Sequence, residues 1–115
     1  MIFVGDNKEY AFEGPYTLGG WQPFERPGLF AIMYRQSGRR QRYPVIYLGE
    51  SDNFAAEGFP FRHPKSPCWM QRVPSRWRLA VAYLILDGST PSIRRAMVSR
   101  LVDIYNPICN EDPAP

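Results

Sequence analysis

PGLFAIMY at residues 27–34 and PVIYLG at residues 44–49 are the two stretches of sequence that decide the predicted fold. Both are rich in β-branched and aromatic side chains and are bounded by proline and glycine, as strands usually are. Between them lies the polar, glycine-containing run SGRRQR at residues 37–42, which is typical of a hairpin connection. We therefore predict two antiparallel strands, the first beginning at Gly28 and the second ending at Gly49.

The chain before this hairpin is expected to add a small extension. Residues 1–13 alternate in the manner of a second, N-terminal hairpin, and residues 13–26 contain enough glycine and proline to predict a loop. After the central hairpin, Ser51 or Asp52 can cap a short helix that Gly58 would end. One or two helical turns are expected over residues 68–73.

The last third of the chain predicts a strand and a helix. Residues 77–86 are apolar on both alternating faces from Leu79 onward, which predicts a strand covered on both sides. Thr90 and Pro91 form a helix start, and the helix is expected to reach Tyr105. Its apolar face is predicted to consist of Ile93, Met97, Leu101 and Ile104. The fold class is therefore α+β: a small antiparallel sheet of three central strands plus an N-terminal hairpin, flanked by helices.

Length and composition limit the class of protein. The 115 residues, 44% of them hydrophobic and 15% aromatic, predict one folded domain over residues 1–115. No apolar run approaches the roughly 20 residues of a membrane span, and no signal peptide is visible, so we expect no membrane partner and a cytoplasmic location. Cys68 and Cys109 are expected to be reduced, partly buried thiols. With His63 as the single histidine, a four-ligand zinc site would need carboxylates from elsewhere.

Basic residues are unevenly distributed although the net charge is only +3. Residues 58–86 contain five basic side chains and no acidic one, and residues 35–42 contain four arginines. Such segregation indicates a side that faces a polyanion, with an ordinary solvated surface as the alternative.

Gly28-Leu29-Phe30 on one strand and Tyr47-Leu48-Gly49 on the next resemble the paired signatures of the GIY-YIG nuclease superfamily. The polar run from Ser51 to Phe54 and the helix end from Leu101 to Asn110 are similar to later segments of that family, in the same order. The resemblance covers residues 27–110 and leaves residues 1–26 as an extension. It implies a three-stranded antiparallel sheet flanked by helices.

The resemblance also implies a site for phosphodiester cleavage. In the family, two motif tyrosines, an arginine and a metal-holding glutamate surround one phosphate, which fits the need for charge neutralisation and a positioned water. Here Tyr47 matches the second tyrosine and Asn110 the terminal asparagine. The other three positions fall on Phe30, Glu57 and Val98, none of which has the required chemistry. The resemblance therefore implies an impaired nuclease.

Three functions follow as expectations. The first is a GIY-YIG-like domain that binds nucleic acid, without a cofactor, through Arg39, Arg40, Arg42, Arg62, Lys65, Arg72, Arg94 and Asn110. The second is an active divergent endonuclease that uses Tyr47 and His63 as catalytic residues, with Mg²⁺ or Mn²⁺ on a relocated carboxylate such as Glu50 or Glu57. The third is a protein-interaction domain with an exposed aromatic patch of Trp21, Phe24, Phe59, Phe61 and Trp69.

Overall fold

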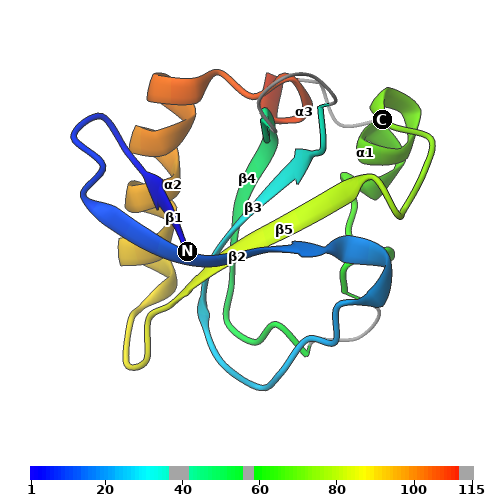
Figure 1. Ribbon diagram of the computed structural model, residues 1–115. Coiled ribbons are helices and arrows are strands. Elements are labelled where there is room, and N and C mark those ends of the chain that lie inside the picture. Colours follow the sequence, from blue (N-terminus) through cyan, green and yellow to red (C-terminus); the bar gives the residue numbers. More distant parts are fainter. Residues whose placement is uncertain (37–41, 56–58, 112–115) are drawn as a thin grey trace.

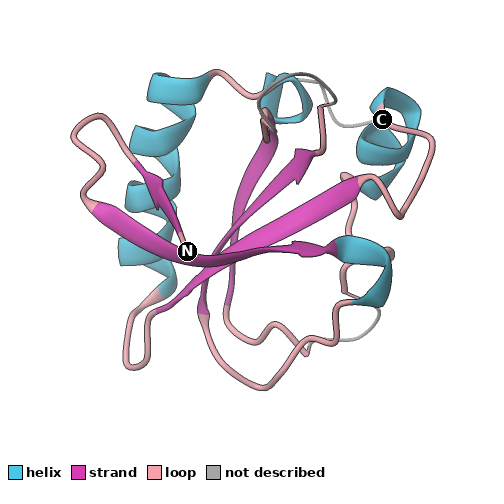
Figure 2. Cartoon of the chain, viewed as in Figure 1, coloured by secondary structure: helices cyan, strands magenta, loops and turns pink. Residues whose placement is uncertain are grey.

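The computed structural model of the chain describes residues 1–36, 42–55 and 59–111 (Figure 1). In these ranges the strands form one antiparallel sheet in the order β1-β2-β5-β3-β4, with helices packed around it (Figures 1 and 2). The strands are β1 (Ile2–Val4), β2 (Tyr10–Thr17), β3 (Gly28–Tyr34), β4 (Val45–Ser51) and β5 (Leu79–Ile85). The helices are η1 (Leu18–Gly20), α1 (Ser66–Arg72), α2 (Pro91–Tyr105) and α3 (Ile108–Glu111). The predicted α+β class is confirmed.

The core lies on both faces of the paired strands β3 and β5. Phe30 and Val81 belong to one buried cluster, which includes Trp69 of α1. Ala31 belongs to the other cluster, which Leu101 of α2 covers. Alternate residues of these central strands thus enter different cores, as the apolar run in β5 predicted.

The central hairpin is formed as predicted, although its second strand continues to Ser51 instead of ending at Gly49, and its pairing explains the two glycines. Phe30 pairs with Gly49, and Ile32 pairs with Tyr47. A Cβ atom on Gly49 would lie 2.6 Å from Cζ of Phe30, and a Cβ atom on Gly28 would overlap the carbonyl oxygen of Leu84. Both glycines are therefore required by close packing within the sheet.

Two local predictions differ from the structure. The strand β2 continues to Thr17 through an irregularity after Glu13, because Gly14 adopts a φ of +109° and the chain bulges instead of ending its pairing. No helix begins after Gly49 in the described residues 50–55, since Ser51 is still part of β4 and its hydroxyl accepts a hydrogen bond from the Asn53 N–H.

The helix α2 has the predicted bounds, and the Thr90 hydroxyl caps it by accepting from the Ile93 N–H at 3.2 Å. Three residues of the predicted apolar face, Met97, Leu101 and Ile104, do pack against the core, and the prediction fails only at the first turn. Ile93 is 54% exposed, whereas Arg94 and Leu101 are buried. The reason is that Arg94 forms ion pairs with Glu50 of β4 and with Asp52, which follows that strand, and these pairs hold its side chain in the interior.

Cys68 of α1 and Cys109 of α3 form a disulfide, with their Cα atoms 5.8 Å apart. The prediction of two reduced thiols was wrong. The two cysteines are separated by 41 positions in the sequence, and only the packing of α1 and α3 on the same cluster brings them together. Among the described residues, no helix is long and apolar enough to cross a bilayer.

Candidate functional site

The two positions that match the family's tyrosines lie together in an aromatic cluster. The rings of Phe30 and Tyr47 have centroids 5.8 Å apart on neighbouring strands. The segment before α1 adds His63, 5.2 Å from Tyr47, and α1 adds Trp69, 5.5 Å from Tyr47. His63 stacks on Trp69 at 5.2 Å with an interplanar angle of 22°. The structure thus brings the predicted catalytic pair Tyr47 and His63 into contact.

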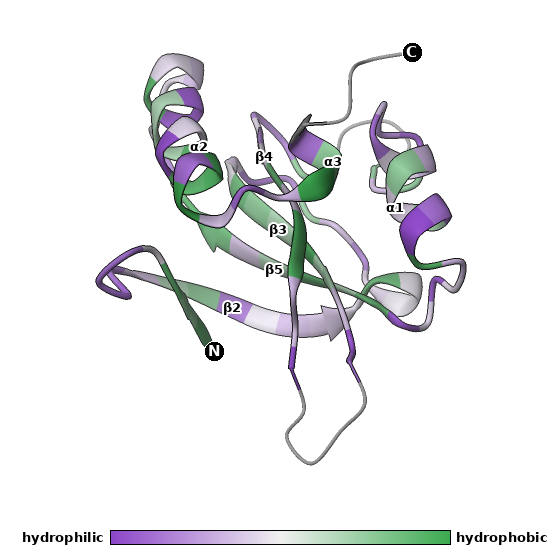
Figure 3. Ribbon diagram, turned by 90° about the horizontal axis from the view of Figure 1, so that it is seen from above, coloured by the Kyte–Doolittle hydropathy of each residue, from purple (hydrophilic) through white to green (hydrophobic). Residues whose placement is uncertain are grey.

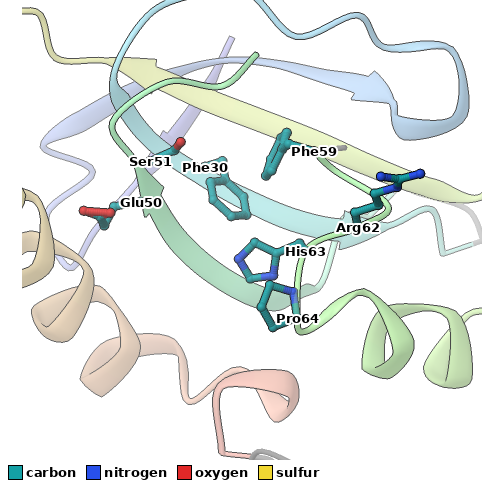
Figure 4. A pocket seen from close by; sticks show the side chains of 7 residues that line it. All are labelled: Phe30, Glu50, Ser51, Phe59, Arg62, His63 and Pro64. Atoms are coloured by element: carbon teal, nitrogen blue, oxygen red, sulfur yellow. The ribbon is translucent and has the colours of Figure 1, made fainter. Parts of the chain in front are cut away.

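A pocket of about 190 Å³ opens beside this cluster (Figure 4). Figure 4 shows Phe30, Phe59 and His63 around the pocket, Glu50 at one edge and the Arg62 side chain extending from the other. Ser51 and Pro64 complete its lining. The pocket is therefore mostly aromatic, with charged groups at its rim.

The protonation chemistry of the pair does not favour base catalysis at neutral pH. Burial, and to a smaller extent the charge of Glu50, raises the pKa of Tyr47 above its ordinary value, so its phenol stays protonated. Burial, followed by the nearby Lys65 charge, lowers the pKa of His63, so the ring is neutral. The Lys65 main-chain N–H donates to Nδ1 of His63 at 3.0 Å, which leaves the ring proton on Nε2. Neither nitrogen then offers a free lone pair to abstract a proton.

The position at which the resemblance implies a metal-binding glutamate is occupied by the apolar side chain of Val98. Val98 lines a groove of about 430 Å³ between β4, α2 and α3, together with Tyr47, Glu50 and Asn110. Oε1 of Glu50 lies 3.4 Å from Nε of Arg94, so this carboxylate is already beside a cation. In the part of the chain that the structure describes, no three His, Cys, Asp or Glu side chains converge to hold a metal. The described residues do not fit the divalent ion of the nuclease family.

Arg94 is not a surface contact for nucleic acid, contrary to the prediction. Its side chain is 1% exposed, and its guanidinium forms an ion pair with Asp52 and two 2.9 Å hydrogen bonds to the carbonyl and hydroxyl oxygens of Ser89. Nε remains beside Glu50. This guanidinium is buried and already paired with Asp52 and Ser89, so it is not presented to a phosphate at the surface, although its Nε has no hydrogen-bond partner among the described residues.

Asn110 also has a structural role. Its amide group forms two 2.8 Å hydrogen bonds with the main chain of Leu48, accepting from the N–H and donating to the C=O. Because β4 is an edge strand of the sheet, this side chain takes the place of a neighbouring strand at Leu48. Binding of nucleic acid by Asn110 stays a prediction.

Four of the described arginines lie at the end of the sheet where β3 stops and β4 and β5 begin. Main-chain hydrogen bonds join Arg35 to Arg78 at 2.9 Å and Gln36 to Arg42 at 3.0 Å. Arg72, the last residue of α1, lies with Arg78 along a hollow of about 330 Å³. In Figure 3, the short segments that lead from β3 and β4 to residues 37–41 are hydrophilic. We call Arg35, Arg42, Arg72 and Arg78 the basic end.

The structure places the remaining predicted contacts as follows. Arg62 is exposed at the aromatic pocket, and half-buried Lys65 immediately precedes α1. Arg39, Arg40 and Glu57 lie outside the described residues. The sequence pattern places Arg78 in the basic region from Arg62 to Arg78 that is predicted to hold nucleic acid, but it assigns no such role to Arg35. The position of Arg35 and Arg78 in the sequence could have indicated their proximity. Arg35 follows β3 and Arg78 precedes β5, and these two strands are paired at that end of the sheet.

The aromatic patch expected for a protein-interaction domain is not exposed. Trp69 is fully buried, and the other four rings, those of Trp21, Phe24, Phe59 and Phe61, are partly buried against the same core cluster. Arg76 also covers the Phe61 ring at 4.9 Å. The protein-interaction hypothesis loses the feature on which it depended.

Comparison of the chain with known protein families, with curated proteins and with solved structures found no match. The assignment to a functional class therefore depends on the geometry and chemistry described above.

Proposed function

We propose that this domain binds nucleic acid through the basic end and that its GIY-YIG-like site is catalytically impaired. The observation that carries the proposal is the arrangement of Arg72 and Arg78 along one hollow whose lining contains no carboxylate. Two guanidinium groups beside one concave surface suit the oxygens of a phosphate backbone.

The charges of the basic end are not neutralised by the described residues. Arg35 donates to the Thr17 hydroxyl at 2.8 Å, and Arg78 donates to the Arg35 carbonyl at 3.2 Å, so both pair with neutral oxygens. No ion pair to a described carboxylate is formed by Arg42 or Arg72. An anionic polymer would therefore gain charge neutralisation without first displacing a described carboxylate.

Impaired catalysis is supported by three features of the site. Phe30 lacks a hydroxyl, Val98 cannot hold a metal, and Tyr47 is protonated at neutral pH. Removal of one charge-stabilising group from such a site commonly costs 10²- to 10³-fold in rate, and here more than one is absent.

Binding is tested by fluorescence anisotropy of a labelled oligonucleotide at several salt concentrations. We expect binding at low salt that weakens steeply as salt rises. Arg72→Gln/Arg78→Gln should weaken binding. It should also reduce the magnitude of the slope of log affinity against log salt concentration by roughly 1.4 to 1.8, which is about 0.7 to 0.9 for each lost phosphate contact. The matched control is Arg95→Gln/Arg100→Gln, which removes the same charge from α2. Absence of binding at low salt, or equal losses in both double variants, would contradict the proposal.

Cleavage is tested separately with supercoiled plasmid and either Mg²⁺ or Mn²⁺. The expected result is no nicking above the background of a mock purification. Nicking by the unchanged protein that disappears in Tyr47→Phe would instead establish the divergent nuclease.

The cellular location stays a prediction. The sequence indicates cytoplasm, whereas the Cys68–Cys109 disulfide is of a kind that persists mainly in oxidising compartments. Alkylation of free thiols in intact cells, followed by mass measurement of the protein, distinguishes the cytoplasm from an oxidising compartment. Cysteines that are oxidised, and therefore not alkylated, would count against the cytoplasm.

A further inference from the structure

We propose that the aromatic pocket formed by Phe30, Phe59 and His63 accepts one unpaired nucleobase, so that the domain prefers single-stranded over duplex nucleic acid. The inference rests on the proposed function, because it specifies which form of nucleic acid the domain would bind.

The three rings meet at nearly right angles. Phe30 and Phe59 are 4.9 Å apart with an interplanar angle of 75°, and Phe30 and His63 are 5.7 Å apart at 79°. Phe59 and His63 are 6.2 Å apart at 83°. Three such planes form the walls of a corner. A flat ring placed against one wall stacks on that ring and meets the edges of the others.

The accessible walls are suited to a heteroaromatic ring. Phe30 is fully buried, whereas Phe59 and His63 are partly exposed and can present a face to a ligand. A neutral His63 keeps the Nε2–H as a donor for a ring nitrogen or carbonyl oxygen of a base. The apolar walls favour stacking, which tolerates several bases because every base has an aromatic face.

The charge at the rim identifies the rest of the ligand. Arg62 lines the pocket, is exposed and forms no ion pair with a described carboxylate. A phosphate attached to the bound nucleotide would find this guanidinium beside it. A base together with an adjacent phosphate is therefore a better match for the pocket than an uncharged aromatic compound.

The helix α1 connects the pocket to the basic end. His63 and Pro64 lie shortly before its first residue, and Arg72 is its last. A helix of this length spans roughly 10 Å, so one strand could place a base in the pocket and a later phosphate at Arg72. A base within a duplex is stacked and paired and cannot enter a recess of about 190 Å³ without leaving the helix.

The test measures affinities for three labelled probes of equal length: a single strand, its duplex, and the same single strand with abasic positions. The single strand should bind at least about 5-fold more tightly than the other two, from the range of stacking contributions per base. Phe59→Leu keeps an apolar side chain but removes the stacking face, so it should remove this preference and leave duplex binding unchanged. Phe3→Leu, which alters an exposed ring of β1, is the matched control.

Two results overturn the inference by itself. If single strand, duplex and abasic probe bind equally while Arg72→Gln/Arg78→Gln weakens all three, the proposed function stands and the base pocket is wrong. Equal loss of single-strand and duplex binding in Phe59→Leu also excludes a base-specific role. Should Phe59→Leu prove unfolded in a thermal melt, the abasic comparison on the unchanged protein decides. Absence of binding to every probe at low salt overturns the proposed function as well.

Discussion

The side-chain amide of Asn110 pairs with both main-chain groups of Leu48, through two hydrogen bonds of 2.8 Å. The contact joins the short helix α3 to the edge strand that carries Tyr47. It satisfies an N–H and a C=O that would otherwise lack a strand partner. The segment after α2 is thereby held against the candidate site.

We expect Asn110→Ala to lower the free energy of unfolding by about 1 to 3 kcal/mol, because it leaves two partly buried main-chain groups of Leu48 without their partner. Urea denaturation measures the change. Ser99→Ala is the control, since Ser99 lines the same groove but is exposed, and its effect should stay within about 0.5 kcal/mol. Equal stabilities of Asn110→Ala and the unchanged protein would show that the pairing contributes nothing.

Reduction of the Cys68–Cys109 disulfide should destabilise the domain. The bond joins residues 41 positions apart, and the loop-closure entropy of the unfolded chain gives an upper expectation of about 4 kcal/mol. Urea denaturation with and without a reductant measures the loss. Cys68→Ala/Cys109→Ala should be less stable and insensitive to the reductant. A reductant effect that persists in the double variant would contradict this assignment.

The sequence predicts the elements whose signals are local. Gly28 and Gly49 bound two apolar runs, and these runs form the paired strands β3 and β4. The hydroxyl of Thr90 marks the start of α2 because a cap needs only the next turn of the helix. The end of β2 was predicted wrongly, since glycine and proline that usually stop a strand here form a bulge within it.

The parts of the site that escaped prediction depend on contacts distant in sequence. Arg94 occupies a helix position that could equally face solvent, and only Asp52 and Ser89 from other segments explain its burial. Phe59 and Phe30 form a pocket wall because an irregular segment folds over β3, and irregular segments have no periodic signal. Tyr47 and His63 were named together as catalytic residues, and their rings do lie in contact. The sequence contains no signal for the geometry of that contact.

Arg94→Met should destabilise the domain by about 2 to 4 kcal/mol, because it leaves Glu50 beside an apolar side chain and removes the partner of Asp52. Arg94→Lys should be intermediate, since it keeps the charge but lacks the planar fork that reaches Ser89 and Asp52 through separate nitrogens. Thermal unfolding ranks the three proteins. At a temperature where all are folded, oligonucleotide affinity should be unchanged, because Arg94 is buried. A loss of oligonucleotide affinity in Arg94→Lys without a matching loss of stability would show that Arg94 contacts the nucleic acid.

The stability of the domain should depend on pH through His63, the single histidine of the chain. Burial first, and then the Lys65 charge, holds the pKa of the folded residue below its ordinary value of about 6.5. As the pH falls below this value, the unfolded chain binds the proton first, so the free energy of unfolding decreases until the folded residue is also protonated. Above about pH 7 the contribution is fully present.

Urea denaturation between pH 5.5 and 7.5, a window above the ordinary pKa values of carboxylates, measures this dependence. His63→Gln should remove the slope, because glutamine does not titrate. Its stability should then be nearly constant across the window, with any packing loss appearing as a uniform offset. The same slope in both proteins would assign the pH dependence to another group and would mean that His63 is not buried as the structure describes. A slope of opposite sign, with stability rising as the pH falls, would mean that the folded state stabilises the protonated ring instead.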